Sequence, residues 1–273
     1  PCVIVPVGIY KTTLTLVVPS YKTFIGTSPN IRDYNGVTSS VISYDGAIDH
    51  TAAVIRVGTN IVGATPSTTA HAVVVRNLYL RANNKAGFGI YGTSMSTESL
   101  IDSITARDTL EYGFYFARSW YATYSRLVSI YSKGQGLAFG MPLVLLDGTD
   151  YTSGWGSATY EMNNVFIRNI RSSDAGRYYS IDNPNTYDPT NATHRMKGYG
   201  IGIGRGNSIH VSNLTSEASG GAGLYIYNDG RPICTIQGGY IEIVCQNSGL
   251  ANNIIASIII DVTTSSIGLE IRD

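Results

Sequence analysis

The amino-acid sequence predicts an all-β solenoid in which short strands wind into stacked coils. One pattern recurs five times: a polar residue, a β-branched or leucine-rich run, a small polar turn, then glycine and an apolar strand. Aligning the second glycine of each turn gives the series Gly89, Gly113, Gly136, Gly200 and Gly223, with steps of 24, 23, 64 and 23 residues. So short a period, with no helical spacing of apolar residues, is typical of a solenoid in which each repeat is one rung.

Each repeat opens at a residue that fixes its internal alignment. These residues are Asn77, Ser103, Arg126, Asn169 and Asn213, and Leu or Ile follows every one of them. Stacked coils would therefore place a column of aliphatic side chains in the interior. We expect the asparagines to form part of a side-chain ladder that the serine and the arginine interrupt. We also expect the repeated glycines to occupy turns that need positive φ.

Composition supports this fold class and argues against several kinds of partner. The chain has 273 residues, of which 14% are charged, with 30 Gly, 20 Tyr and a net charge of +0. Low charge with abundant Gly and Tyr fits an all-β body with tight turns. A neutral chain offers no electrostatic basis for binding nucleic acid. The longest apolar stretch, Ile254 to Ile260, is too short to cross a bilayer, so no membrane insertion is expected.

The cysteines and histidines give no sign of a metal centre. Three cysteines form neither a disulfide framework nor a zinc pattern, and the four histidines lack metal-binding spacing. No dinucleotide or phosphate-binding fingerprint occurs either. The sequence therefore predicts no cofactor and no metal.

The start of the chain carries a family resemblance. A Pro-x-Gly-x-Tyr turn at Pro6, Gly8 and Tyr10 precedes a strand, a short connection and a second strand that ends in Ile25-Gly26. This opening resembles the first coil of the pectate-lyase-like superfamily, and it is also common in phage tailspikes and related polysaccharide depolymerases. The resemblance implies a right-handed parallel β-helix that forms a single domain over residues 1–273 of a longer chain. It further implies a homotrimer, located on a virion tail or outside the cell.

Two segments break the repeat and are the expected location of function. Residues 141–160 follow the Gly136 coil, and residues 177–197 split the Asn169 coil. Long ordered excursions from a rigid scaffold often carry function, although a trimer contact or a cap is the structural alternative. Aromatic rings suit the faces of pyranoses, and arginines in this region suit the cation or base that a lyase needs. The predicted substrate-binding residues are Trp120, Tyr151, Trp155, Arg177, Tyr178, Tyr179, Tyr187 and Arg195.

Carboxylates recur at one place on successive coils and are the predicted catalytic groups. Asp108 and Asp174 each lie five residues after the opening residue of their repeat, and Glu217 lies four residues after. Equal offsets become a column in a solenoid, so the two aspartates should lie two rungs, or roughly 10 Å, apart. That separation slightly exceeds the roughly 6.5–9.5 Å of inverting glycosidases, and Glu111 or Asp182 could narrow it. Local hydrogen bonding in turns is the alternative explanation for these acids.

The resemblance and these residues together favour a tailspike-like protein that binds a bacterial surface polysaccharide and cleaves it by hydrolysis. Asp174 and Asp108 are the predicted acid–base pair, with Asp174 shielded by the 177–197 excursion so that its pKa rises toward that of a general acid. One alternative is a receptor-binding or structural spike that grips glycan without cleaving it. Another is an extracellular pectinase-like lyase, although the Asp-rich calcium cluster of pectate lyases is not recognisable.

Overall fold

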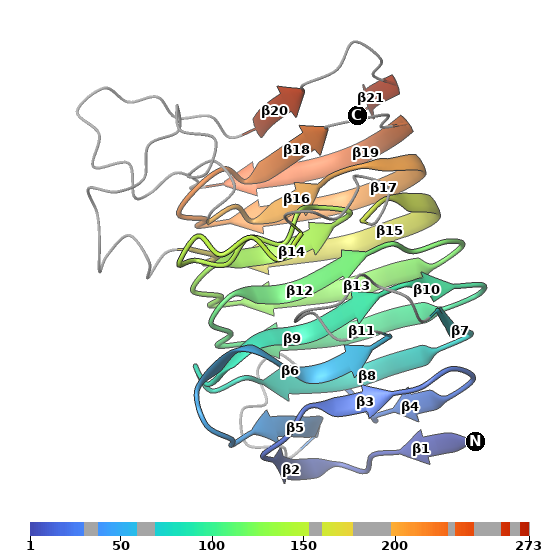
Figure 1. Ribbon diagram of the computed structural model, residues 1–273, viewed down its shortest axis with the longest axis vertical. Helices are drawn as coiled ribbons and strands as arrows, with labels where there is room; N and C mark the ends of the chain where they lie inside the picture. Colours follow the sequence, from blue (N-terminus) through green and yellow to red (C-terminus); the bar gives the residue numbers. More distant parts are fainter. Residues whose placement is uncertain are drawn as a thin grey trace.

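The computed structural model of this chain is a stack of coils built from parallel strands (Figure 1). It describes residues 1–29, 38–58, 69–152, 160–176, 198–228, 233–242, 258–262 and 268–272. Within these ranges no residue is helical, and every ladder between two named strands is parallel. The described residues accordingly include no helix that could cross a membrane. The predicted parallel β-helix is confirmed.

Two sheets run along the stack and form the walls of the solenoid. The first sheet contains, in spatial order, β1 (Cys2–Ile4), β4 (Thr23–Ile25), β8 (Val74–Arg81), β11 (Leu100–Arg107), β13 (Thr123–Ile130), β15 (Met162–Ser173), β17 (Gly206–Glu217), β19 (Ile233–Glu242) and β21 (Gly268–Arg272), with β2 (Gly8–Thr12) and β5 (Ser40–Tyr44) joined beside β8. The second contains β3 (Leu16–Val18), β6 (Asp49–Val57), β9 (Ala86–Thr93), β12 (Tyr112–Ala117), β14 (Gln135–Phe139), β16 (Ile201–Ile203), β18 (Leu224–Asn228) and β20 (Ile258–Val262). A separate pair, β7 (Ala70–His71) and β10 (Met95–Ser96), lies at one corner.

Long strands of the first sheet turn a corner through single left-handed residues. Asn77, Ser103, Arg126, Asn169 and Asn213 all have φ between 51° and 59°. The residue that opens each repeat therefore lies at a bend inside a strand. The side chains of this corner column join as expected where asparagines meet, because Asn213 Nδ2 donates to Asn169 Oδ1 at 3.0 Å. Where the serine and the arginine interrupt the asparagine ladder, a different hydrogen bond joins the coils: Arg126 Nε donates to Ser103 Oγ at 2.6 Å.

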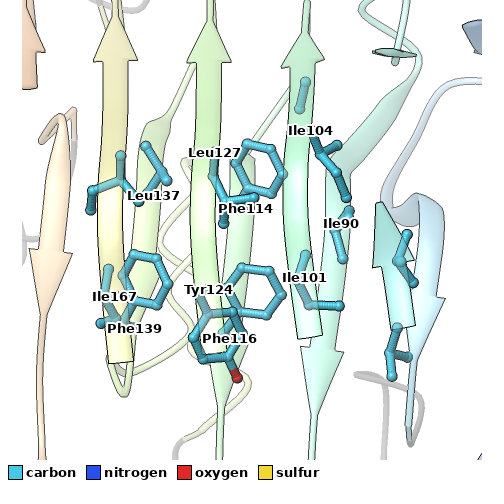
Figure 2. Packing of buried hydrophobic residues seen from close by; sticks show 14 of the residues in the cluster. Ile90, Ile101, Ile104, Phe114, Phe116, Tyr124, Leu127, Leu137, Phe139 and Ile167 are labelled. Carbon is cyan, nitrogen blue, oxygen red and sulfur yellow. The ribbon is translucent and has the colours of Figure 1, made fainter. Parts of the chain in front are cut away.

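The aliphatic column predicted next to this corner fills the interior. Leu78, Ile104 and Leu127 are in register on β8, β11 and β13, and Ile170 pairs with Leu214 on β15 and β17. All five are at most 2% exposed. Figure 2 shows two of them, Ile104 and Leu127, beside Ile90, Phe114 and Leu137 of the second sheet. Burying each one stabilises the fold by about 1.5–3 kcal/mol relative to leaving it in water.

The repeated glycines have a different role from the one expected. None of Gly89, Gly113, Gly136, Gly200 and Gly223 has positive φ, and the first three lie inside strands of the second sheet. They stack on one another, so that a Cβ added at Gly113 would meet the carbonyl oxygen of Gly136 at 2.7 Å. The expectation of positive φ was wrong because steric exclusion inside the coil, rather than turn geometry, selects these glycines.

The first excursion covers an aromatic stripe on the outer face of the second sheet. The rings of Tyr91 and Tyr115 stack with centroids 5.4 Å apart across β9 and β12. Tyr115 Oη donates to the carbonyl oxygen of Met141, and Tyr112 Oη donates to that of Val144, both at 2.8 Å. The described part of this excursion, residues 141–152, is thereby fixed to β12 by phenol hydrogen bonds.

Candidate functional site

The predicted carboxylate column lies where the chain passes from the first sheet to the second. We call this line the turn edge and define it by Asn83, Asp108, Tyr131, Asp174 and Ala218, which all have φ between 52° and 57°. Backbone bonds join successive coils just here: Asp108 N donates to Ile130 O, Tyr131 N to Ser173 O, and Asp174 N to Glu217 O. Asp108 and Asp174 are therefore two rungs apart, with Tyr131 on the rung between them.

Glu217 belongs to a different line. It is the last residue of β17 and is in register with Ser173, one position before the turn edge. Its Oε2 accepts a hydrogen bond from Arg171 Nη2 at 2.6 Å and another from Ser173 Oγ at 3.3 Å. The structure thus pairs this carboxylate with an arginine at a strand end and does not align it with the two aspartates.

Asp108 borders a small pocket at the turn edge. The pocket has a volume of about 240 Å³ and is lined by Asn84, Asp108, Tyr131 and Lys133. Burial raises the pKa of the Asp108 carboxyl, and the Arg107 guanidinium, whose Nε lies 3.2 Å from Oδ2, acts in the opposite direction. Its side chain still keeps 30% of its surface exposed. This carboxyl therefore retains a proton more readily than a free aspartate while remaining in contact with solvent.

Glu111 lies nearby but is enclosed. It is 1% exposed, and its two oxygens contact His50 Nδ1 at 2.5 Å and the backbone N–H of Leu146 at 2.7 Å. Burial raises the pKa of Glu111, while the hydrogen bond from His50 lowers it. Both oxygens are engaged, and the contact with Leu146 anchors the first excursion. The sequence did not indicate His50, because it lies 61 residues before its partner.

The predicted sugar-binding aromatics do not form one group with these acids in the described part of the chain. Trp120 lies at the corner between β12 and β13, one corner away from the turn edge, and the Arg118 guanidinium is 5.5 Å from the centroid of its ring. Tyr151 is half-buried beside the aromatic stripe, and its N–H donates to Leu143 O at 2.9 Å. Seven predicted residues lie outside the described ranges: Trp155, Arg177, Tyr178, Tyr179, Asp182, Tyr187 and Arg195.

A hollow on the outer face of the first sheet was not predicted. Its volume is about 440 Å³, and we call it the corner hollow. The residues of its lining that matter chemically are Phe166, Arg168, His210, Asn213, Thr235 and Gln237. Most of these side chains point outward from β15, β17 and β19 beside the corner column. Each strand read alone shows only ordinary polar alternation, so the hollow becomes visible only when the three rungs are stacked.

Among all the residues that the structure describes, no group of three or more His, Cys, Asp or Glu side chains is placed to bind a metal ion. The strongest chemical features are therefore the turn edge, with its partly buried aspartate, and the corner hollow.

The similarities found for this chain are to solved structures. No family model and no curated protein matches the sequence. One similar solved structure is ORF18 of Geobacillus virus E2, which is 12% identical, with 89% of this chain and 51% of that chain covered and a TM-score of 0.41. Another is a variant of the catalytic domain of GH87 α-1,3-glucanase in complex with tetrasaccharides, at 10% identity, 100% and 49% coverage, and a TM-score of 0.42. The chain thus spans about half the length of each. At these values, neither protein assigns a site or an activity to this chain.

Proposed function

We propose that this protein binds a bacterial surface polysaccharide along the turn edge and hydrolyses it. Asp108 acts as the general acid and Asp174 as the general base, the reverse of the roles expected from the sequence, because burial raises the pKa of Asp108. The proposal depends on one observation: burial raises the pKa of a carboxyl that borders a pocket with Tyr131 and Lys133. A general acid must carry a proton when the substrate binds, and partial burial shifts the pKa of a carboxyl in that direction.

The spacing of the two aspartates favours inversion of the anomeric centre. Two rungs of a parallel stack separate them by roughly 10 Å, whereas retaining enzymes hold their carboxyls only about 5–5.5 Å apart. A water molecule fits between carboxyls at the longer separation, which lies closer to the inverting range than to the retaining one. Asp174 would then activate the water while Asp108 protonates the leaving oxygen.

A non-catalytic glycan-binding spike is the second candidate, and one observation favours it. Asp108 and Asp174 both have φ of 57°, a conformation that aspartate accepts more readily than most residues. Backbone geometry alone could therefore have selected them. In that case the turn edge holds a polysaccharide through hydrogen bonds and the Lys133 charge, and no bond is broken.

The test compares Asp108→Asn, Asp174→Asn and the control Asp45→Asn on a panel of bacterial surface polysaccharides. Asp45 lies at the same corner of an earlier coil and pairs with Lys85 and Lys11 at the surface, so the control makes the same change outside the pocket. The two test variants should lose turnover by about 100-fold or more while keeping the fold and glycan binding. The control should cleave like the wild type.

The outcomes separate the candidates. Unchanged cleavage by a folded Asp108→Asn protein would refute the acid assignment. Binding of a polysaccharide by the wild type, with no shortening of its chains, would establish the spike. New chain ends that absorb in the ultraviolet would identify a lyase and contradict hydrolysis. An inverted anomer of the first product, observed by NMR, would support the two-rung mechanism.

A further inference from the structure

The corner hollow arises because two columns of side chains both change from large to small residues at the same rung. Along the outward column, Phe166 and His210 are followed by Thr235. Along the corner column, Asn169 and Asn213 are followed by Gly238, which has a φ of 68°. Strand β19 therefore contributes small groups where β15 and β17 contribute large ones, and a depression opens above them.

One side of this depression offers a ring face. The rings of Phe166 and His210 stack with centroids 5.2 Å apart and an interplanar angle of 17°. Arg168 places its guanidinium 5.1 Å from the centroid of Phe166, on the same strand. Because Thr235 carries no ring, the stack stops at His210. A ligand ring with an apolar face of about the same width could continue it, as the C–H faces of sugar rings do on aromatic side chains.

The wall around this ring is rich in hydrogen-bonding groups and has one fixed positive charge. Asn213 Oδ1 faces the empty position over Gly238, and the amide of Gln237 lies in the next row. No carboxylate lines the hollow, and Arg168 forms no ion pair with any residue that the structure describes. The nearest acid along the column is Glu270, which pairs with Thr235 in the ladder and is bonded to Arg272 at 2.6 Å.

We propose that the corner hollow binds a single pyranose unit carrying an anionic substituent. The sugar ring stacks on His210, the amides of Asn213 and Gln237 bind its hydroxyls, and Arg168 pairs with the carboxylate or phosphate group. A guanidinium suits this role because its planar fork matches both kinds of oxyanion. This inference rests on the proposed function only in taking the ligand to be a sugar, and it requires no cleavage.

The binding test uses small sugars so that the turn edge plays no part. D-glucuronate, D-galacturonate, N-acetylneuraminate and D-glucose 6-phosphate are titrated at constant ionic strength and compared with D-glucose and D-galactose. Side-chain amide signals of Asn213 and Gln237 report binding by NMR. At least one anionic sugar should bind about tenfold or more tightly than its neutral counterpart, as expected for a charge-assisted pair.

Two variants and a matched control locate the site. Arg168→Gln should remove the preference for anionic sugars while leaving the stacking residues in place. Gly238→Asn should abolish binding of every sugar, because it extends the asparagine ladder into the hollow at a φ that Asn169 and Asn213 already adopt. Arg76→Gln is the control, because Arg76 is an exposed arginine in the same outward row, three rungs from Arg168. It should leave binding unchanged.

Several results would overturn the proposal. They are the absence of amide shifts with all four anionic sugars, equal effects of Arg168→Gln and Arg76→Gln, or unchanged binding in a folded Gly238→Asn protein. If Gly238→Asn does not fold, the comparison of the two arginine variants decides. Binding in the hollow should persist in Asp108→Asn, so a failure of hydrolysis and a failure of this site are distinguishable.

Discussion

At the scale of single residues, burial decides which acid a ligand can reach. Glu111 and Asp108 lie in the same turn, and burial raises the pKa of both. Glu111 has both oxygens engaged and is 1% exposed, whereas the Asp108 side chain keeps 30% of its surface exposed beside a pocket. Glu111 therefore holds the 141–152 segment in place, whereas Asp108 remains accessible to a ligand.

Glu111 should make stability depend on pH. Because its folded-state pKa lies above the ordinary 4.5, the folded protein binds a proton more readily than the unfolded chain. The free energy of unfolding therefore falls as pH rises from that ordinary value through the folded-state pKa. Glu111→Gln keeps an acceptor for Leu146 and cannot ionise. When the pH is lowered from about 7 to about 4, the free energy of unfolding of the wild type should therefore rise relative to that of Glu111→Gln.

Urea unfolding at several pH values measures this difference. His50→Gln serves as the control background, because it removes the imidazole that contacts Glu111, and the shift should persist there. Asp147 is the other charge that acts on this carboxyl, and it raises the pKa further. If the free energies of unfolding of the wild type and Glu111→Gln changed with pH in parallel, the prediction would be wrong. The Glu111 carboxyl would then have the same pKa in the folded and unfolded chains.

Residue positions were more predictable than residue roles. The offset of five places Asp108 and Asp174 at the turn edge because every coil turns at the same point. Their environments depend on contacts between distant parts of the chain. His50 meets Glu111 from 61 residues away, and Arg171 meets Glu217 from 46. No local pattern carries that information.

At the scale of elements, close contact between strands selects the glycines. A Cβ at Gly113 would lie 2.0 Å from Ser129 Oγ and 2.7 Å from the carbonyl oxygen of Gly136. Equivalent contacts recur at Gly136 with Ser172, and at Gly200 with Ser216. The period of the glycines predicted the coil correctly. The steric reason for glycine at these positions could not be inferred from the sequence, because the opposing serines lie on another face of the coil.

Gly113→Ala should destabilise the coil by about 1–3 kcal/mol, the usual cost of overpacking a filled interior. Ser129→Gly opens space opposite it, so the double variant should recover part of the loss. The carbonyl of Gly136 remains in the way, so recovery should be incomplete. A double-mutant cycle from urea unfolding measures the coupling. Strictly additive effects would mean that the two side chains do not compete for the same space.

At the scale of the whole molecule, the parallel stack predicted from the sequence is confirmed, whereas the predicted assembly stays a prediction. We propose a side-by-side homotrimer, as the resemblance to tailspikes implies. A solenoid leaves strand edges and side faces uncovered, and symmetric association is a common way to cover them. Leu14 and Val17, which are 75% and 51% exposed on an early coil, are apolar groups that such an interface would bury.

Light scattering of the purified chain should give three times the mass of one chain. Replacing Leu14 and Val17 with Lys should lower that mass if these residues lie in the interface, whereas Lys at exposed Tyr240 on β19 provides a comparison elsewhere. A monomeric wild type at micromolar concentration would refute the trimer.

The constant register of the coils also sets an order of folding. Most successive coils close loops of 23 or 24 residues, so each added rung costs nearly the same chain entropy and is rewarded by contacts with its neighbour. The closure from Gly136 to Gly200 spans 64 residues, which costs about 0.9 kcal/mol more by the logarithmic dependence on loop length. Growth of the stack should therefore slow at this rung, so that the coils on either side of it form as two kinetic blocks before they join.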